Sequence, residues 1–207
     1  MEFVRKPTNR TRKGLVEKAG INDADYATSY KAGGKYIVCP YYRKWKNMLK
    51  RCYSLAYLNK HPTYRDCKVD TEWLKFSNFR EWMITQDWQG KDLDKDLLIK
   101  GNKIYSPSLC VFINPSTNLA IAKSGKKDVR LLAGVTYTKS NTKYVAVVHK
   151  GTPSKKTYLG TYSTEVEAHN VWRLEKANHF RCLAKRESDK RVKNALCKMA
   201  RDLEILV

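Results

Sequence analysis

The apolar residues of this chain repeat with different periods on the two sides of one polar segment, residues 123–132. Before this segment they recur mainly every three or four positions, which indicates helices, and after it they alternate over short stretches, which indicates strands. The segment begins Lys-Ser-Gly-Lys-Lys-Asp, a composition typical of linkers. The 207 residues are enough for two small domains. We therefore expect two modules and no single extended core.

Basic residues outnumber acidic residues in every part of the chain. There are 41 Lys and Arg against 20 Asp and Glu, and the net charge is +21. The excess is +4 in residues 1–38, +9 in 39–132, +5 in 133–181 and +3 in 182–207. A hydrophobic content of 42% excludes a disordered polycation. This distribution favours a folded protein that lies along a nucleic-acid duplex and neutralises its phosphates.

Several classes of protein are excluded by the same sequence. No stretch approaches the roughly 20 apolar residues that span a bilayer, and the N-terminus turns polar before a signal peptide can form, so we expect a soluble, intracellular protein without a membrane partner. The six cysteines form no Cys-x-x-Cys pair, and the four histidines are not spaced with them as in a zinc site. We expect free, partly buried thiols.

The first module is expected to be mainly helical behind a polar arm. Residues 1–20 carry a basic cluster among Pro, Thr, Asn and Gly, which predicts a flexible arm that either contacts phosphates or stays solvated. A helix is predicted from Pro40, and a second from about Thr71 to Met83. The apolar face of the first helix comprises Tyr42, Trp45, Met48, Leu49, Cys52 and Tyr53.

The end of this module has a strand, turn, strand and helix pattern. The strands are predicted at Leu93–Ile99 and Leu109–Ile113, with a turn at Gly101-Asn102 between them. A short helix is expected after Pro115.

The second module, residues 133–181, is predicted to be a three-stranded antiparallel sheet packed on a helix. The strands are Val135–Lys139, Tyr144–His149 and Thr157–Tyr162, and Thr164 with Glu167 forms a capping box for the helix. Alternation turns Ala146 and Val148 toward the helix. The opposite, exposed face is predicted to carry Thr136, Thr138, Lys139, Lys143, Val145, Val147, His149, Lys156 and Tyr158.

A last helix is predicted in residues 182–207, capped by Ser188. Its apolar stripe contains Val192, Leu196, Met199 and Leu203. The stripe either belongs to the core or forms the seam of a homodimer, and the sequence does not choose between the two.

The second module resembles the ethylene-response-factor (Apetala-two) type of DNA-binding domain. The resemblance is carried by Gly134-Val135, Tyr144–Ala146, Tyr158–Tyr162 and Glu167-Ala168. It implies that the outer face of the sheet enters the major groove of duplex DNA while the helix packs behind it. Thr136 and His149 stand where that family usually carries arginines, which weakens the expectation of bidentate guanine recognition.

The first module is similar to HNH homing endonucleases of phages. The similarity is carried by Leu93–Leu97, Gly101–Pro107, Cys110–Phe112 and Asn118, and upstream by Cys39–Trp45, Met48–Tyr53, Glu72–Leu74 and Phe76–Phe79. It implies an α+β chain in which a helical, ββα-metal-like HNH module spans residues 21–122.

An HNH site needs a histidine to activate water and an acidic residue with a further His or Asn to hold one Mg²⁺ or Mn²⁺. By the resemblance, Asp94 is the metal-side acid, Asn102 the central asparagine and Asn118 the helix ligand. Lys95 stands at the histidine position, where a protonated lysine cannot accept a proton from water and would suit a phosphate contact. His61 could replace the histidine only if folding brings it close.

Two functions follow from these expectations. The first is a sequence-specific duplex DNA-binding protein derived from a homing endonuclease, which needs no cofactor and regulates or represses transcription by occupying its site. The alternative is an active metal-dependent homing endonuclease that uses Asp94, Lys95 and Asn102. In both cases the expected place of action is the cytoplasm of a bacterial host, on nucleoid or phage DNA.

Overall fold

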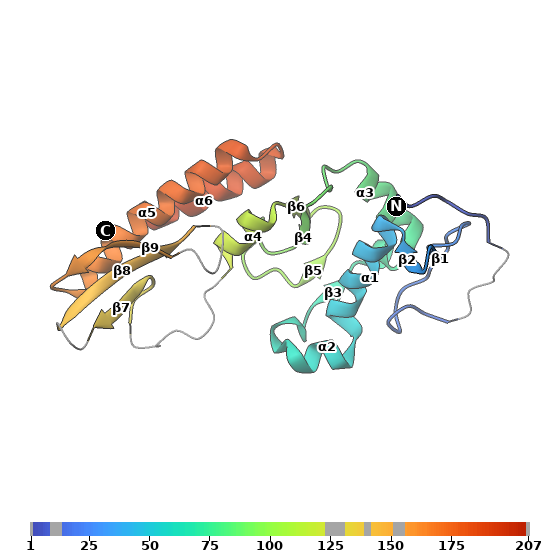
Figure 1. The fold of residues 1–207 in the computed structure, drawn as a ribbon, viewed down its shortest axis with the longest axis horizontal. Helices are drawn as coiled ribbons and strands as arrows, with labels where there is room; N and C mark the ends of the chain where they lie inside the picture. The colour runs from blue at the N-terminus through green and yellow to red at the C-terminus, as the bar shows by residue number, and fades with distance from the viewer. Residues whose placement is uncertain (1, 9–13, 123–130, 139–141, 151–155, 206–207) are drawn as a thin grey trace. The chain divides into compact units, whose positions relative to one another are not determined.

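The chain folds into two compact units that each combine helices and strands (Figure 1), and the mixed α+β class predicted above is confirmed. The computed structural model describes residues 2–8, 14–122, 131–138, 142–150 and 156–205. Unit 1 comprises Met1–Gln89 and Leu93–Phe112, and unit 2 comprises Gly90–Asp92 and Ile113–Val207. In the described part of the chain, no helix is long and apolar enough to cross a bilayer.

Unit 1 is built from short helices and pairs of short strands. Its helices are α1 (Pro40–Tyr53), α2 (Leu55–Lys60) and α3 (Phe76–Ile84), with 3-10 turns η1 (Pro62–Tyr64) and η2 (Thr71–Leu74). Its strands are β1 (Ser29–Ala32), antiparallel to β2 (Lys35–Val38), and β3 (Lys68–Val69), parallel to β5 (Ile104–Tyr105). Strand β4 (Asp92–Asp94) pairs with β6 (Val111–Ile113). The β1–β2 hairpin was not predicted from the sequence. Its turn contains Gly33 and Gly34, and both have positive φ.

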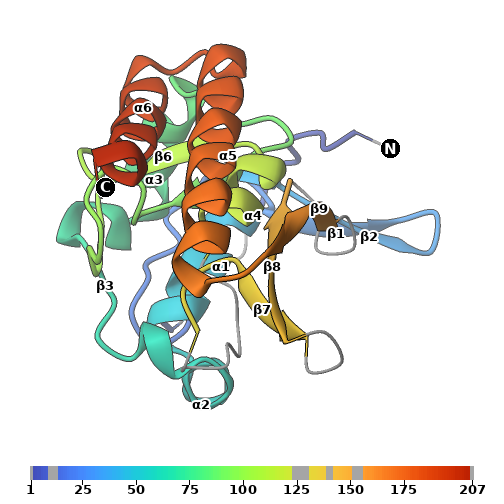
Figure 2. The ribbon, with the colours of Figure 1, turned by 90° about the vertical axis from the view of Figure 1, so that its left-hand side faces the viewer.

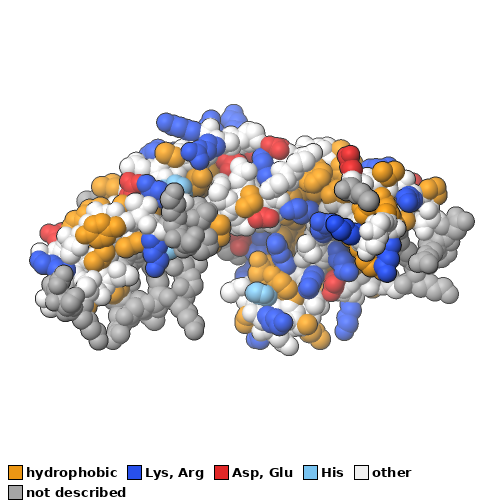
Figure 3. Space-filling model, viewed as in Figure 1, with side chains coloured by type: hydrophobic (Ala, Val, Ile, Leu, Met, Phe, Trp, Pro, Cys, Tyr) orange, Lys and Arg blue, Asp and Glu red, His pale blue; other side chains and the backbone are white. Residues whose placement is uncertain are grey.

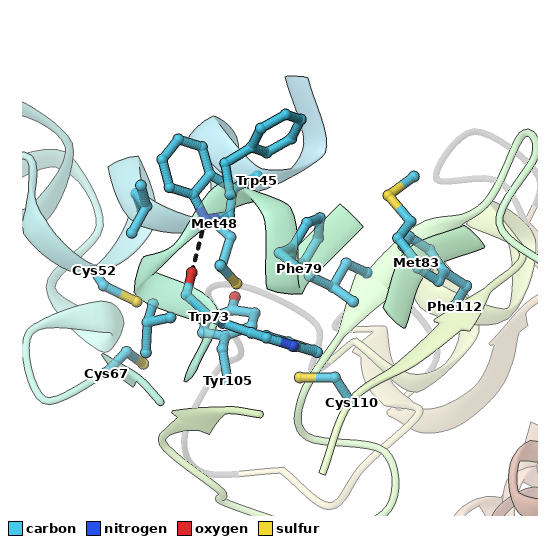
Figure 4. Packing of buried hydrophobic residues seen from close by; sticks show 14 of the residues in the cluster. Trp45, Met48, Cys52, Cys67, Trp73, Phe79, Met83, Tyr105, Cys110 and Phe112 are labelled. Atoms are coloured by element: carbon cyan, nitrogen blue, oxygen red, sulfur yellow. Dashed lines mark hydrogen bonds between the residues drawn. The ribbon is translucent and has the colours of Figure 1, made fainter. Parts of the chain in front are cut away.

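The core of unit 1 is dominated by aromatic side chains from α1, η2 and α3 (Figure 4). Trp45 of α1 is fully buried and donates a hydrogen bond from its indole Nε1 to the backbone oxygen of Trp73, at 2.7 Å. The Trp73 ring meets that of Phe79 edge-on, with centroids 5.0 Å apart. The helix predicted from Pro40 and its apolar face are thus confirmed, because Trp45 and Leu49 both lie in this core.

The helix predicted over about Thr71 to Met83 is interrupted. Lys75 has an extended conformation, with φ −86° and ψ 131°, and separates η2 from α3. The cause is tertiary pairing: Ile21 N donates to Leu74 O at 2.7 Å, and Phe76 N donates to Ile21 O at 3.0 Å. Because both neighbours of Lys75 are hydrogen-bonded to Ile21, Lys75 takes extended and not helical dihedral angles.

The segment predicted as a flexible arm packs on unit 1 where it is described. The Phe3 ring lies 6.0 Å from that of Tyr26 and 5.7 Å from that of Tyr30, measured between centroids. Ala27 N donates to Lys6 O at 2.8 Å. The aromatic contacts of Phe3 hold these residues on unit 1, and the polar composition of the segment gave no sign of them. Residues 9–13 lie outside the described part of the chain.

The strands predicted around the Gly101-Asn102 turn are both shorter than expected. Strand β4 ends at Asp94, whose side chain accepts backbone hydrogen bonds of the following turn, so residues up to Ile99 do not continue the strand. The turn itself is present, and Gly101 has φ +82°. Between this turn and β6 the chain instead adds β5, which pairs with β3.

Where it is described, unit 2 consists of a three-stranded sheet and three helices. The strands are β7 (Val135–Thr138), β8 (Lys143–His149) and β9 (Lys156–Tyr162), and the helices are α4 (Pro115–Ile121), α5 (Glu165–Arg186) and α6 (Lys190–Ile205). The sheet is antiparallel in the order β7-β8-β9, and α5 lies along one of its faces (Figure 2). The predicted sheet, its helix and the Thr164–Glu167 capping box are confirmed.

The sheet approaches α5 closely because the residues between them are small. Ala146 of β8 and Ala168 of α5 are fully buried in one cluster with Val135 of β7. Gly134 has φ +79°, and a Cβ atom there would lie 2.1 Å from the Trp172 ring. Only glycine fits both the backbone angle and the contact.

The last helix, α6, packs against α5 within the same chain. Of its stripe residues, Val192 and Leu196 are fully buried while Met199 and Leu203 are half-buried, so the stripe packs largely into the core. Arg173 of α5, also buried, donates from Nε to Leu203 O at the end of α6, at 2.8 Å. At the start of α6, the Asp189 carboxylate accepts a hydrogen bond from the backbone N–H of Arg191 at 2.8 Å.

Helix α4 belongs to unit 2, so the division of the chain precedes it and does not fall at residues 123–132. The buried Glu187 accepts hydrogen bonds through Oε1 from Thr117 Oγ1 at 2.7 Å and from Asn114 Nδ2 at 3.2 Å. Lys176 of α5 donates to Ala120 O at 2.7 Å. These contacts fix α4 to the α5–α6 pair.

Replacing Ala146 by Asp should unfold unit 2, because it places an unpaired charge where β8 meets α5. We expect a loss of at least about 3 kcal/mol in the free energy of unfolding. The measurement is thermal and urea unfolding followed by circular dichroism. The matched control is Val147→Asp, one residue along β8 on the opposite face, which should fold; equal loss in both variants would contradict this assignment of the faces.

Candidate nucleic-acid interface

The face of the sheet opposite α5 is defined by the strand register. Thr136 of β7 pairs with Val145 of β8, which pairs with Thr161 of β9, and Val147 pairs with Tyr158. Directly paired residues of an antiparallel sheet point to the same face. With the pairs Thr138–Lys143 and His149–Lys156, these residues form one surface, here called the sheet face: Thr136, Thr138, Lys143, Val145, Val147, His149, Lys156, Tyr158 and Thr161.

The predicted outer-face residues are brought together on the sheet face. The assignment agrees for each of them that the structure describes, and Lys139 lies outside the described residues. Tyr158 is the most exposed large hydrophobic side chain among them, at 64%. Val145 and Val147 are half-buried. The opposite side of β8 carries the buried Ala146 and Val148, as predicted.

Thr161 was missed, because simple alternation along β9 places it on the helix side. The register shifts by one residue between Ala146 and Val147 of β8, which leaves Leu159 as an extra residue in β9. Such a bulge turns Tyr158 and Thr161, three positions apart, toward the same face. Their hydroxyl oxygens are hydrogen-bonded at 2.6 Å. The signal that could have found the bulge is Gly160, a glycine inside a strand, with φ +138°.

The charges of the sheet face lie at its two ends. Lys143 begins β8 and donates from Nζ to Ser163 Oγ at 3.0 Å. His149 ends β8 and pairs with Lys156 at the start of β9. Between these ends, the side chains of the two central rows are uncharged. The arrangement can hold an anionic backbone at the rims and contact bases at its centre.

A second basic surface lies in unit 1, on the exposed side of α1. A cavity of about 370 Å³ is lined by Glu17, Ser29, Val38, Tyr42, Arg43, Lys46, Asn47 and Lys50. Its three cations, Arg43, Lys46 and Lys50, are here called the basic groove, and their spacing puts them on one face of the helix. Among the described residues, none of the three forms an ion pair. Figure 3 shows Lys and Arg side chains over both units.

The basic groove was not recognised as a site in the sequence. Its residues were visible as the polar side of the helix that begins at Pro40, but the hollow exists because Ser29 and Val38 of the β1–β2 hairpin lie beside them. Because the β1–β2 hairpin was not predicted, the sequence gave no indication of the cavity beside α1.

The residues matched to an HNH site serve the turn between β4 and β5. Asp94 Oδ1 accepts hydrogen bonds from the backbone N–H groups of Asp96 at 2.9 Å and Leu97 at 2.7 Å. Asn102 donates from Nδ2 to Lys95 O at 2.9 Å and to Ile104 O at 2.7 Å. The structure thus brings Asp94, Lys95 and Asn102 into one turn. The Asp94 carboxylate and the Asn102 side-chain amide bind backbone groups of that turn.

Lys95 is directed into the protein, where little of its surface is left for the phosphate contact expected for it. Only 6% of the residue is exposed. Its ammonium donates to the Asp96 carboxylate and to Asn102 O, the latter at 2.9 Å. Burial alone would lower the pKa of Lys95, but the hydrogen bond and the negative charge of Asp96 outweigh burial and raise it. A lysine held in this protonated state cannot act as a general base.

The side chains matched to the metal site make other contacts in the structure. Asp94 belongs to unit 1, and burial raises the pKa of its carboxyl group. Asn118 belongs to unit 2 and donates from Nδ2 to Asp92 Oδ2 at 3.4 Å. The His61 ring lies against that of Tyr57, with ring centroids 4.3 Å apart and the planes inclined by 30°. Over the described ranges, no three His, Cys, Asp or Glu side chains gather into a metal-binding group.

Comparison with known proteins identifies no relative: no protein-family description, curated protein or solved structure matches this chain. The properties of the two surfaces therefore rest on their own geometry and chemistry.

Replacing Lys95 by Met should destabilise unit 1, because it removes the charged hydrogen bonds to Asp96 and Asn102. We expect a loss of about 1–3 kcal/mol at pH 7, measured by urea unfolding. A raised pKa means that folding favours the protonated lysine. Its contribution is complete below the ordinary lysine pKa of about 10.4 and is lost as the pH rises through the raised value. The difference between the two proteins should therefore shrink only in strongly alkaline solution.

The control for this change is Lys100→Met, at an exposed lysine five positions along the chain. It should alter the free energy of unfolding by less than about 0.5 kcal/mol. Equal stability of wild type and Lys95→Met would show that the ammonium is not held inside.

Proposed function

We propose that this protein binds duplex DNA by placing the sheet face in the major groove. The observation that carries the proposal is the division of the sheet into a face covered by α5 and an exposed face with cations at both ends and Tyr158 near its centre. Three strands about 4.8 Å apart span about 10 Å between the outer two, and the major groove of B-DNA is about 12 Å wide. The sheet therefore has a suitable width.

The dimensions and charges also support the ethylene-response-factor type of recognition suggested by the sequence, in which the sheet reads DNA and the helix supports it. The basic groove adds a second DNA contact in unit 1. Its cations carry no sequence information, so their role is to neutralise phosphates and increase affinity. The net charge of +21 extends this contribution to the rest of the chain.

The protein acts by occupying its site, as a regulator or repressor of transcription on the DNA of a bacterial host or its phage, and binding needs no cofactor. The region from β4 to α4 is a degenerate HNH scaffold in this proposal. Two observations support loss of cleavage: Lys95 is buried and protonated, and Asp94 and Asn102 bind the backbone of their own turn.

Binding should be steeply salt-dependent, and the two surfaces should contribute differently. The double variant Tyr158→Ala/Lys143→Ala should lose at least about tenfold in affinity for a specific site, because it removes contacts in the groove. The triple variant Arg43→Gln/Lys46→Gln/Lys50→Gln should weaken binding to all sequences and reduce the slope of log K against log salt by up to about 2.7. Fluorescence anisotropy over a salt series measures both effects.

The matched control is Tyr36→Ala/Lys100→Ala, which removes an exposed tyrosine and an exposed lysine from unit 1 outside both surfaces. It should bind as wild type, apart from the small effect of one charge. A salt slope near zero for the wild type would overturn duplex binding, and unchanged affinity of Tyr158→Ala/Lys143→Ala would show that the sheet is not the recognition surface.

Wild-type protein should not cleave its bound site in the presence of Mg²⁺ or Mn²⁺ at neutral pH, because Lys95 cannot accept a proton from water. Conversion of supercoiled plasmid to nicked and linear forms measures cleavage. Rapid cutting by the wild type that Asp94→Ala abolishes, with binding retained, would establish the alternative, an active metal-dependent endonuclease.

A further inference from the structure

We propose that the sheet face selects sites containing A·T pairs by contacting the C5-methyl groups of thymine in the major groove. This inference rests on the proposed DNA binding and adds which chemical group of the bases is recognised. In the major groove, thymine alone among the four unmodified bases presents a methyl group, and apolar side chains are its natural contacts.

The centre of the sheet face is apolar and hydroxyl-bearing. One cross-strand row consists of Thr136, Val145 and Thr161, and the next pairs Val147 with Tyr158. All five side chains are uncharged, and each offers methyl groups or an aromatic ring. The half-buried Val145 and Val147 lie in the middle strand, so they are the side chains most nearly opposite the floor of a groove that receives the sheet.

Apart from the lysines at its two ends, the described part of the sheet face lacks the side chains that read other base edges. Bidentate recognition of guanine uses Arg or Lys, that of adenine uses Asn or Gln, and cytosine is contacted by Asp or Glu. Within the described residues, the sheet face has no Arg, Asn, Gln, Asp or Glu. Its lysines occupy the ends, where Lys143 is bonded to Ser163 and Lys156 lies in the first position of β9.

The bulge in β9 prepares the centre of this face for an apolar contact. The hydroxyl groups of Tyr158 and Thr161 bond to each other at 2.6 Å across the bulge. A hydroxyl that already has a partner loses less on desolvation than an unpaired one. The Tyr158 ring and the Thr161 methyl group can therefore meet a thymine methyl without leaving these hydroxyls unsatisfied.

The spacing of the two valines matches the spacing of base pairs. Val145 and Val147 are separated by two residues of strand, about 6.8 Å. Two steps of B-DNA rise by about the same distance, since successive base pairs are about 3.4 Å apart. When β8 runs along the groove, the valines face base pairs that are two steps apart.

The test uses the full-length protein and a duplex recovered from a randomised pool. We expect enrichment of A·T pairs, including thymines two positions apart on one strand or across strands. Replacing those thymines by deoxyuridine removes only the methyl groups. Affinity should then fall by about fourfold for each contacted methyl, and 5-methylcytosine in place of cytosine at a contacted position should strengthen binding.

Two variants locate the effect within the protein. Val145→Ser/Val147→Ser removes both methyl groups of each valine and puts a single hydroxyl in their place, and it should reduce the thymine-to-uracil affinity ratio toward one. The control is Lys46→Gln in the basic groove, which should weaken binding to both duplexes equally and leave the ratio unchanged. Circular dichroism checks that both variants fold.

The outcomes separate this inference from the proposed function. If wild-type protein binds no duplex, the proposed DNA binding is overturned and the inference with it. If it binds duplex but recovers G·C-rich sites, or binds the thymine and deoxyuridine duplexes equally, DNA binding stands and methyl recognition is overturned. A thymine preference that survives in Val145→Ser/Val147→Ser would also overturn it, because the valine methyl groups would not be the contact.

Discussion

The close packing of β8 on α5 is the constraint on which the proposed recognition surface depends. Ala146 and Ala168 are both fully buried, and Gly134 leaves space for the Trp172 ring. Because strand side chains alternate, burying Ala146 and Val148 commits the residues between them to the opposite side. The half-buried Val145 and Val147 of β8 are thereby left on the opposite face, beside threonine and tyrosine hydroxyl groups. Lys143 and Lys156 lie at the two ends of this face. The chemistry of the sheet face follows from which residues the helix covers.

In unit 1, the polar groups of the turn between β4 and β5 serve the fold. The Asp94–Asn102 turn is held by side-chain bonds to backbone, and Lys95 completes it from within. A lysine amine has to be neutral to accept a proton, and the carboxylate of Asp96 favours its charged form. The same interaction that stabilises the turn opposes general-base catalysis. Binding without cleavage is consistent with this arrangement.

Sequence reasoning succeeded where one local pattern controlled one element. The α1 helix from Pro40 and the strands of unit 2 were predicted with small errors in their ends, because their burial follows a regular period. It failed where distant pairing competed with local preference. Lys75 breaks a helix because Ile21 pairs with its neighbours, and Thr161 faces outward because β9 contains a bulge. Neither contact is visible within a short window of sequence.

The sequence by itself determined the charge, the alternation of β8 and the residue types available to either face. Those quantities depend on composition and on the two-residue period of a strand, which no tertiary contact alters. The tertiary structure decided three other matters: Lys95 points inward, the stripe of α6 packs largely into the core, and the basic groove exists beside the β1–β2 hairpin. Each of these features depends on contacts between segments that are far apart in the sequence. The free energy of burial that stabilises such contacts is a property of the whole fold.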